Sequence, residues 1–216
     1  KHLEYRISET SYSSHVAHTS AWSFDASLTV LFSTMVKGGS LSILPLITEF
    51  SQSDDFFKLL SDTNVNEINM VPSLLRLFIS YGLDKTSIHT ITSAGEELSS
   101  EIACSIHHDS PIQLINEYGP SECTILATRS LISDSSVNHP TIGVPILGCK
   151  IELRNIDDSV DEICISGDYV GLGYLGDKVK NQHSFFFDKG ILWYRSGDVG
   201  VFDPNGNLQW QGRTDH

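Results

Sequence analysis

Three short segments combine side chains that could bind a phosphorylated ligand, and the longest is residues 116–124 (NEYGPSECT). Gly119 and Pro120 predict a turn, and a hydroxyl and a carboxylate follow at once in Ser121 and Glu122. A hydroxyl can hydrogen-bond a phosphate oxygen, and a carboxylate can hold a hard cation such as Mg²⁺. Considered alone, the segment could equally begin a helix that Ser121 caps.

The other two segments are residues 194–198 (YRSGD) and 212–215 (GRTD). Asp198 could bind the two hydroxyls of a ribose, as acidic side chains do in nucleotide sites, or it could close an ordinary Asx turn. Arg213 and Asp215 stand in a short polar turn. Because ordinary turns are common, each segment considered alone is best explained by a purely structural role. A binding function requires that the segments belong to one site.

The elements expected around the first segment alternate between helix and strand. Apolar residues at helical spacing, such as Leu28, Phe32 and Met35, predict helices over residues 25–36, 53–60, 72–78 and 98–107. Short apolar runs predict strands over residues 41–45, 67–71, 89–93 and 112–116. This alternation indicates βαβ units around a mostly parallel sheet with flanking helices. Residues 116–124 then follow the carboxyl end of a strand, where open α/β sheets bind ligands.

The pattern changes at the polar, turn-rich residues 133–136 (SDSS). Beyond them, short strands are predicted over residues 150–153, 162–166, 192–194, 199–202 and 208–211. Residues 203–207 (DPNGN) predict a hairpin. We therefore expect an α/β segment over residues 1–133 and a small antiparallel, barrel-like β module over residues 134–216.

Composition excludes several classes of protein. The 216 residues carry 14 Lys and Arg against 27 Asp and Glu, a formal net charge of −13, which argues against a nucleic-acid partner or an anionic membrane surface. Hydrophobic residues make up 40% and charged residues 19%, enough apolar material for a core. No apolar run approaches the ~20 residues of a membrane span, and no signal peptide is recognisable, so we expect a cytoplasmic protein.

Cysteines and histidines give no metal-binding pattern. The four cysteines, Cys104, Cys123, Cys149 and Cys164, are widely spaced and are expected to be buried thiols. The pairs His15/His18 and His107/His108 lack nearby ligands that would complete a coordination shell. We expect these histidines at the surface or at helix ends.

The three segments and three others occur in the order of the core motifs of the adenylate-forming superfamily, and the chain most closely resembles the amino-acid adenylation domains of nonribosomal peptide synthetases. The matching segments are residues 24–27 (FDAS), 94–98 (AGEEL), 116–122 (NEYGPSE), 162–175 (EICISG…GLGYL), 194–198 (YRSGD) and 212–215 (GRTD). The departures within them are Ala94 for a Gly and Ser121 and Ser196 for Thr, and both serines keep the hydroxyl. The resembling segments span almost the whole chain.

The resemblance implies an ATP site. Its positions in this sequence are Ala94, Gly95, Asn116, Glu117, Tyr118, Gly119, Ser121, Asp198 and Arg213. Among them, Tyr118 would stack on the adenine, Asn116 would hydrogen-bond its exocyclic amine, and Asp198 would bind the ribose hydroxyls.

The resemblance also implies the catalytic residues. Ser121 would contact the α-phosphate, Glu122 would help to hold Mg²⁺, and Arg213 would add a ribose or phosphate contact. Asp215 would be the hinge about which a C-terminal subdomain swings between two half-reactions.

The implied amino-acid substrate would meet Asp25, which pairs with the substrate's α-amino group in the resembling family but could also cap a helix. The implied side-chain pocket consists of Ala26, Thr29, Asn69, Thr92, Ala94, Glu117, Ile125 and Leu126. Four of these are polar, and a buried carboxylate such as Glu117 needs a partner. The pocket therefore favours a substrate with a donor: an amide, a hydroxyl, an amine or a modified ornithine.

The implied reaction joins an amino acid to ATP as an aminoacyl-adenylate, releases pyrophosphate, and transfers the aminoacyl group to the phosphopantetheine thiol of a carrier-protein domain. The alternatives are a D-alanine–carrier-protein ligase, an acyl-CoA ligase, and a noncatalytic adenylation domain that serves as an interaction module. The family's phosphate loop and C-terminal subdomain are not recognisable in these 216 residues. We therefore expect these 216 residues to be a central part of the enzyme, and we expect this part to be inactive alone.

Overall fold

The computed structural model describes residues 14–109, 111–133, 138–157 and 160–214, which divide into two compact units. The N-terminal unit contains the described residues up to 116 and those within 131–140. The C-terminal unit contains residues 117–130 and the described residues from 141 onward.

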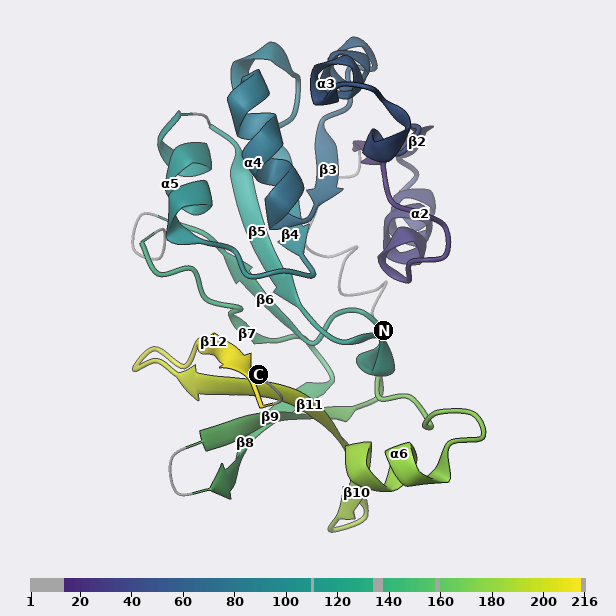
Figure 1. Ribbon diagram of the computed structural model, residues 1–216, viewed down its shortest axis with the longest axis vertical. Coiled ribbons are helices and arrows are strands. Elements are labelled where there is room, and N and C mark those ends of the chain that lie inside the picture. The colour runs from purple at the N-terminus through teal and green to yellow at the C-terminus, as the bar shows by residue number, and fades with distance from the viewer. Residues whose placement is uncertain (1–13, 110, 134–137, 158–159, 215–216) are drawn as a thin grey trace. The chain divides into compact units, whose positions relative to one another are not determined.

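The N-terminal unit is built on a sheet with the strand order β2-β1-β3-β4-β5 (Figure 1). Its strands are β1 (His15–His18), β2 (Ser40–Ile43), β3 (Glu67–Met70), β4 (Thr90–Ala94) and β5 (Gln113–Tyr118), whose last two residues belong to the C-terminal unit. β1 pairs in parallel with β2 and β3, and β3 pairs in parallel with β4. The predicted parallel sheet is confirmed, although β1 was not among the predicted strands, because its sequence HVAH has a histidine at each end and only two apolar residues in succession.

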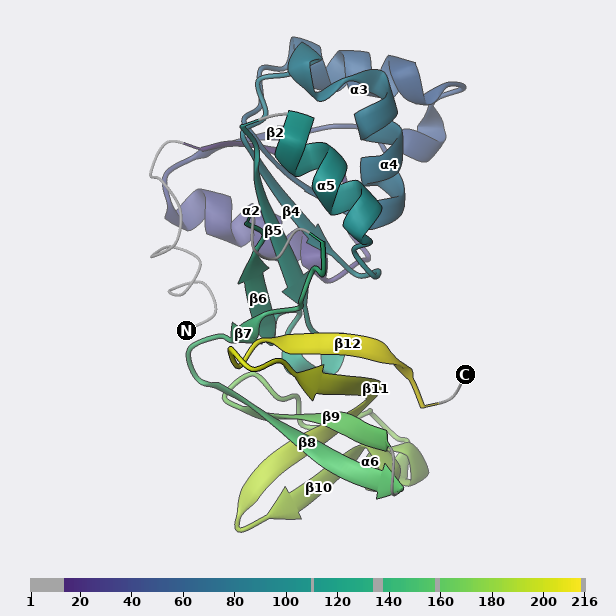
Figure 2. The same ribbon diagram turned by 90° about the vertical axis from the view of Figure 1, so that its left-hand side faces the viewer.

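Helices cover both faces of this sheet. They are α2 (Ala26–Val36), α3 (Ser53–Asp62), α4 (Pro72–Tyr81) and α5 (Ser100–Asp109), with short 3₁₀ turns η1 (Ile47–Glu49) and η2 (Leu83–Lys85). Figure 2 shows α3, α4 and α5 on one face and α2 on the other. All four helices lie where the apolar spacing predicts them.

The core of the N-terminal unit lies between the sheet and α3, α4 and α5. Phe57 of α3 and Phe78 of α4 are fully buried and stack with their ring centroids 5.1 Å apart. Ile68 of β3 and Ile91 of β4 belong to the same apolar cluster and contribute to it from the sheet. Each such side chain contributes about 1.5–3 kcal/mol when removed from water, so the cluster on this face stabilises the unit.

Helix α2 presents its polar side to the sheet. Leu28, Phe32 and Met35, the apolar residues whose spacing predicts the helix, are exposed within the described residues. The buried side chains are Ser27, Thr29, Val30, Ser33 and Thr34. The periodicity therefore predicts the helix correctly but not the face that meets the sheet.

The C-terminal unit is antiparallel, as predicted. Its main sheet has the order β10-β11-β9-β8, with β12 paired to β11. The elements are η3 (Ser121–Cys123), β6 (Thr128–Leu131), β7 (Val144–Pro145), β8 (Cys149–Asp157), β9 (Val160–Gly167), α6 (Lys178–Ser184), β10 (Phe185–Asp188), β11 (Ile191–Phe202) and β12 (Leu208–Arg213). β6 and β7 form a further antiparallel pair.

Two features of this unit differ from the prediction. β11 is one continuous strand with a bulge between Arg195 and Val199, where two strands and a turn are predicted. Helix α6 is not predicted, because KVKNQHS has no apolar period; the Asp177 side chain caps it by accepting from the Lys180 N–H at 2.9 Å. The predicted hairpin is confirmed, with Asp203 Oδ1 accepting from the backbone N–H groups of Asn205 and Asn207.

Cys123, Cys149 and Cys164 are buried free thiols, and Cys104 is a half-buried free thiol. Among the helices that the structure describes, none is both long and apolar enough to cross a membrane.

Candidate functional site

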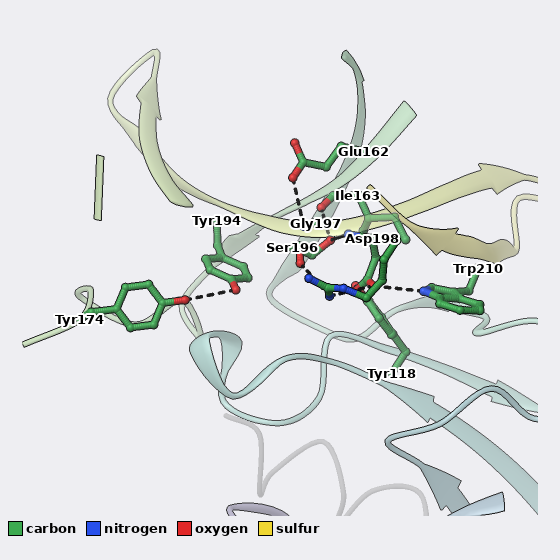
Figure 3. Close-up of polar contacts among 10 residues, drawn as sticks. Tyr118, Glu162, Ile163, Tyr174, Tyr194, Ser196, Gly197, Asp198 and Trp210 are labelled. Atoms are coloured by element: carbon green, nitrogen blue, oxygen red, sulfur yellow. Dashed lines mark hydrogen bonds and ion pairs between the residues drawn. The ribbon is translucent and has the colours of Figure 1, made fainter. Parts of the chain in front are cut away.

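The carboxylate of Asp198 is the centre of a polar cluster in the C-terminal unit (Figure 3). The hydroxyl of Tyr118 donates to Asp198 Oδ2 at 2.7 Å. The indole N–H of Trp210 and the guanidinium of Arg213 donate to Asp198 Oδ1 at 3.2 and 3.3 Å. Three of the predicted site residues, from three separate segments of the sequence, thus meet at one buried carboxylate.

A backbone bulge in β11 presents Asp198 to this cluster. The Ser196 hydroxyl donates to the carbonyl of Ile163 at 2.7 Å and accepts from the Asp198 N–H at 3.0 Å. Gly197 between them has a φ of +73°, a left-handed conformation that glycine adopts without a steric cost. The Gly-Asp pair is therefore a bulge inside a strand, and the alternative of an ordinary Asx turn does not hold.

Glu162 of β9 fixes the same bulge, and the sequence reasoning gave it no role. One carboxylate oxygen accepts from the Gly197 N–H at 3.0 Å, and the other accepts from Arg195 at 2.9 Å. Glu162 is buried, so these two donors replace the hydrogen bonds with water that its carboxylate gives up on burial. The sequence feature that could have indicated a role for Glu162 was its place at the start of the EICISG segment.

Tyr118 keeps its proton at neutral pH. Burial raises the pKa of its phenol well above the usual value of 10, and the negative charge of Asp198 raises this pKa further. The hydroxyl therefore remains a hydrogen-bond donor to Asp198 throughout the physiological range.

The loop after Tyr118 is tightly constrained. A Cβ on Gly119 would lie 2.5 Å from the carbonyl oxygen of Ile125, so only glycine fits there. Ile125 itself has a φ of +77°, a strained conformation for a β-branched residue. The Thr124 hydroxyl anchors the loop by donating to the carbonyl of Tyr169 at 2.7 Å. Ser121 is exposed at the first position of η3.

Glu122 is held by a tyrosine from the GLGYL segment. The Tyr174 hydroxyl donates to Glu122 Oε1 and lies 3.5 Å from the hydroxyl of Tyr194. Asn181 fixes the backbone of Tyr174, because its side chain accepts from the Tyr174 N–H at 2.6 Å and donates to the Tyr174 carbonyl at 2.8 Å. Burial, the hydrogen bond with Tyr174 and the charge of Glu122 all raise the pKa of Tyr194. Sequence reasoning missed Tyr174 as the partner of Glu122 and Tyr194 as the neighbour of Tyr174.

The donor set suits one kind of metal site. No group of three His, Cys, Asp or Glu side chains among the described residues could hold a metal by itself. Glu122 uses Oε1 for Tyr174 and has no hydrogen bond at Oε2 within the described part of the chain. One carboxylate fits Mg²⁺, which is commonly bound by one or two carboxylates together with substrate phosphates.

Glu117 has a charged partner within the C-terminal unit. Its Oε1 lies 3.6 Å from Nε of Arg129, and both side chains are largely buried. Arg129 therefore meets the requirement that a buried carboxylate be paired, so the burial of Glu117 does not by itself call for a donor from a substrate.

The remaining predicted substrate residues mostly belong to the N-terminal unit. Asp25 precedes α2, and its side chain makes no capping hydrogen bond. Thr29 lies on the buried side of α2, and the strand register places Asn69 of β3 directly beside Thr92 of β4. The N-terminal unit also contains Ala26, Ala94, Gly95 and the buried Asn116, while Ile125 and the buried Leu126 follow η3 in the C-terminal unit. Asp215, the predicted hinge, lies outside the described residues.

The prediction that His18 lies at the surface is wrong. Its ring is only 2% exposed and stacks on Trp22 with a centroid distance of 4.1 Å. His15, on the same strand, is half-buried, and its Nε2 lies 2.8 Å from the hydroxyl of Ser42.

Comparison with protein families gives one match over most of the chain. The model of the family described as AMP-binding enzyme matches residues 2–175. Tyrocidine synthase 3 from Brevibacillus parabrevis is 30% identical over 213 residues, which cover 93% of this chain and 3% of that protein. Gramicidin S synthase 2 from Brevibacillus brevis is 27% identical over 231 residues, which cover all of this chain and 5% of that protein. The chain thus spans one twentieth or less of the length of these relatives.

Solved structures share the fold. NpsA from Klebsiella oxytoca, in complex with 3-hydroxyanthranilyl-AMSN, matches with a TM-score of 0.85 and 18% identity over all of this chain and 48% of that one. PA1221, a nonribosomal peptide synthetase protein that contains adenylation and PCP domains, matches with a TM-score of 0.82 and 21% identity. That match covers 94% of this chain and 38% of the other.

Proposed function

This chain belongs to the AMP-binding enzyme family, and from that membership we propose that its parent protein activates an α-amino acid with ATP. The aminoacyl-adenylate formed is then attacked by the phosphopantetheine thiol of a carrier-protein domain. The relatives that carry the word synthase and the structural neighbour with a PCP domain support this proposal.

The convergence of Tyr118, Asp198 and Arg213 is the observation that carries the proposal. The three residues come from segments up to 95 positions apart, and the C-terminal unit brings them to one carboxylate. A neutral phenol, an acidic acceptor and a guanidinium together suit a nucleoside phosphate: an aromatic face for the base, an acceptor for the ribose hydroxyls and a cation for phosphate.

Binding of the ribose would change the contacts of Asp198. An ionised carboxylate has about four acceptor positions, and the cluster uses three of them. The contact with Arg213 is the longest of the three, and the Arg213 side chain is 40% exposed, so it can move. We propose that the ribose hydroxyls take its place and free the guanidinium for the phosphates.

In the proposed first half-reaction, an oxygen of the substrate carboxylate attacks the α-phosphorus of ATP, and the bond to pyrophosphate breaks. Ser121 donates to the α-phosphate, Arg213 offsets its negative charge, and Glu122, held by Tyr174, receives Mg²⁺. Mg²⁺, when bound, neutralises phosphate charge and aligns the leaving group. In the second half-reaction, the thiol sulfur attacks the carbonyl carbon and AMP leaves.

The substrate is proposed to be an α-amino acid with a polar side chain. Asp25 makes no capping hydrogen bond in this chain, so its carboxylate is available to pair with an α-ammonium group. Thr29, Asn69 and Thr92 supply polar groups that suit a polar side chain better than the methyl of D-alanine or a fatty acyl chain.

The proposal is tested by amino-acid-dependent ATP–pyrophosphate exchange in the parent protein. We expect exchange with one member of a panel that contains asparagine, glutamine, threonine, serine, ornithine and D-alanine. Asp25→Ala should lower it by about 100-fold or more, the cost of leaving a buried ammonium unpaired. Asp54→Ala is the matched control, because Asp54 is an exposed acidic residue in the first turn of α3.

Two results would contradict the proposal in different ways. AMP binding without exchange for any amino acid would indicate a noncatalytic nucleotide-binding domain. Absence of AMP binding, or AMP binding that Asp198→Asn leaves unchanged, would refute the assignment of the Asp198 cluster to the nucleotide.

A further inference from the structure

The N-terminal unit contains a buried histidine, His18, whose Nε2 atom has no hydrogen-bond partner among the described residues. His18 ends β1, its side chain is almost fully buried, and Nε2 makes no hydrogen bond within the described part of the chain. Trp22 covers one face of the ring at 4.1 Å and an interplanar angle of 23°. Buried polar atoms without partners are uncommon, because the lost hydration is not replaced. A phenylalanine would fill the same space without this cost.

The neutral ring can present Nε2 as a hydrogen-bond acceptor. Burial lowers the pKa of His18, so the imidazole is neutral at pH 7. A neutral imidazole has one N–H and one lone pair, and in the tautomer protonated at Nδ1 the Nε2 atom is an acceptor that makes no hydrogen bond with the described residues. In that tautomer the lone pair of Nε2 is available to a donor group on a bound ligand.

Strand register places His18 in a row of polar side chains. β1 pairs with β3 through Val16–Glu67 and Ala17–Ile68, and His18 and Asn69 are the next residues on the two strands. Asn69 in turn pairs with Thr92 of β4. Side chains alternate between faces along a strand, and Ala17 and Ile68 belong to the core under α3–α5. The row His18–Asn69–Thr92 therefore lies on the opposite face, which α2 covers.

Helix α2 brings a second unpartnered polar atom to this face. Thr29 is buried on the sheet side of α2, and its Oγ1 has no hydrogen bond within the described residues. The start of α2 lies near the end of β1, because the Ser27 hydroxyl donates to the carbonyl of Trp22, the residue stacked on His18. One face of one unit thus gathers an imidazole acceptor, a carboxamide and two hydroxyls.

We propose that His18 is a specificity-determining residue whose Nε2 accepts a hydrogen bond from a hydroxyl or amide N–H on the substrate's side chain. Asn69, Thr92 and Thr29 complete the recognition of that polar group. The row contains no charged side chain, so it suits a neutral polar side chain. This inference rests on the proposed amino-acid activation.

The test compares each polar substrate with its apolar isostere in the parent protein: threonine with valine, asparagine with leucine, and glutamine with methionine. We expect His18→Phe to lower kcat/KM for the preferred polar substrate by about tenfold, the loss of one hydrogen bond, and to leave its isostere unchanged. His18→Gln keeps a side-chain acceptor and should retain most of the discrimination. His15→Phe is the control, because His15 lies on the same strand and its ring already has a partner in Ser42.

A measurement on the unchanged protein covers the case in which His18→Phe does not fold. Saturating amino acid and a nonhydrolysable ATP analogue should move the ¹⁵N signal of His18 Nε2 in the direction expected for a new hydrogen bond. An unmoved signal, or equal losses for substrate and isostere in His18→Phe, would overturn the role of His18 while exchange in the unchanged protein still supports amino-acid activation. Absence of exchange in the unchanged protein would overturn both.

Discussion

Replacing Tyr118 by phenylalanine removes one hydroxyl from the Asp198 cluster and keeps the aromatic ring. In the structure this hydroxyl lies 2.7 Å from Asp198 Oδ2 and is the only described donor to that oxygen. The variant therefore leaves one oxygen of a buried carboxylate without a donor. The perturbation is confined to one atom because phenylalanine fills the same ring volume.

The expected cost follows from the charge and burial of the acceptor. Hydrogen bonds to charged groups contribute about 1.5–3 kcal/mol, against about 1 kcal/mol for neutral pairs. Trp210 and Arg213 still donate to Oδ1 in the variant, so the carboxylate of Asp198 keeps two of its three hydrogen bonds. We therefore expect a loss of about 2 kcal/mol in the free energy of unfolding, which for a chain of this size lowers Tm by about 4–8 °C.

Urea denaturation followed by tryptophan fluorescence measures this loss, because Trp210 belongs to the cluster. The transition midpoint should fall while the slope m is unchanged. Tyr81→Phe is the matched control, since its hydroxyl makes no hydrogen bond within the described residues while its ring packs on Phe57. A substitution without a special role usually changes the free energy of unfolding by no more than about 0.5 kcal/mol. A loss below about 0.5 kcal/mol for Tyr118→Phe, or an equal loss in both variants, would therefore refute the argument that the Tyr118 hydroxyl stabilises a buried charge.

The remaining predictions concern buried charge and ionisation. Arg129→Met should destabilise the chain by about 3 kcal/mol, because it removes the cationic partner of the buried carboxylate of Glu117, and adding Glu117→Gln should restore most of the loss in urea denaturation. If Glu117→Gln did not restore stability to the Arg129→Met variant, the result would contradict the pairing of Glu117 with Arg129. Burial raises the pKa values of three thiols, so Ellman's reagent should label Cys104 alone in the native chain at pH 8; the three protected residues are Cys123, Cys149 and Cys164. Faster labelling of any of these would disagree with the structure. Because folding raises the pKa of Tyr118 above its unfolded value of 10, its contribution to stability is complete below pH 10 and is lost as pH rises beyond it. Absorbance at 295 nm should then show ionisation of this phenol only together with unfolding, and a fully reversible titration of every tyrosine in the folded chain would oppose this.

Local pattern was sufficient for much of the fold. Phe56, Phe57 and Leu60 are spaced so that one side of a helix is apolar, and that side is buried in α3. Pro72 begins α4 as predicted, since proline at the first turn loses no helical hydrogen bond. The segments with Tyr118, Asp198 and Arg213 were recognisable because their residue types and order are visible in the chain itself.

Long-range contacts decided the features that the sequence left open. The bulge that presents Asp198 depends on Glu162, a residue 36 positions away, and the partner of Glu117 comes from the strand beyond the next loop. The burial of His18 and the polar side of α2 depend on which elements pack together, and short polar segments carry no periodic signal for that choice. The sequence by itself therefore determined the local elements and the candidate groups, because both depend on neighbouring residues. Only the tertiary structure decided which of those groups are buried, charged and paired, because solvation and pairing depend on residues far away in the chain.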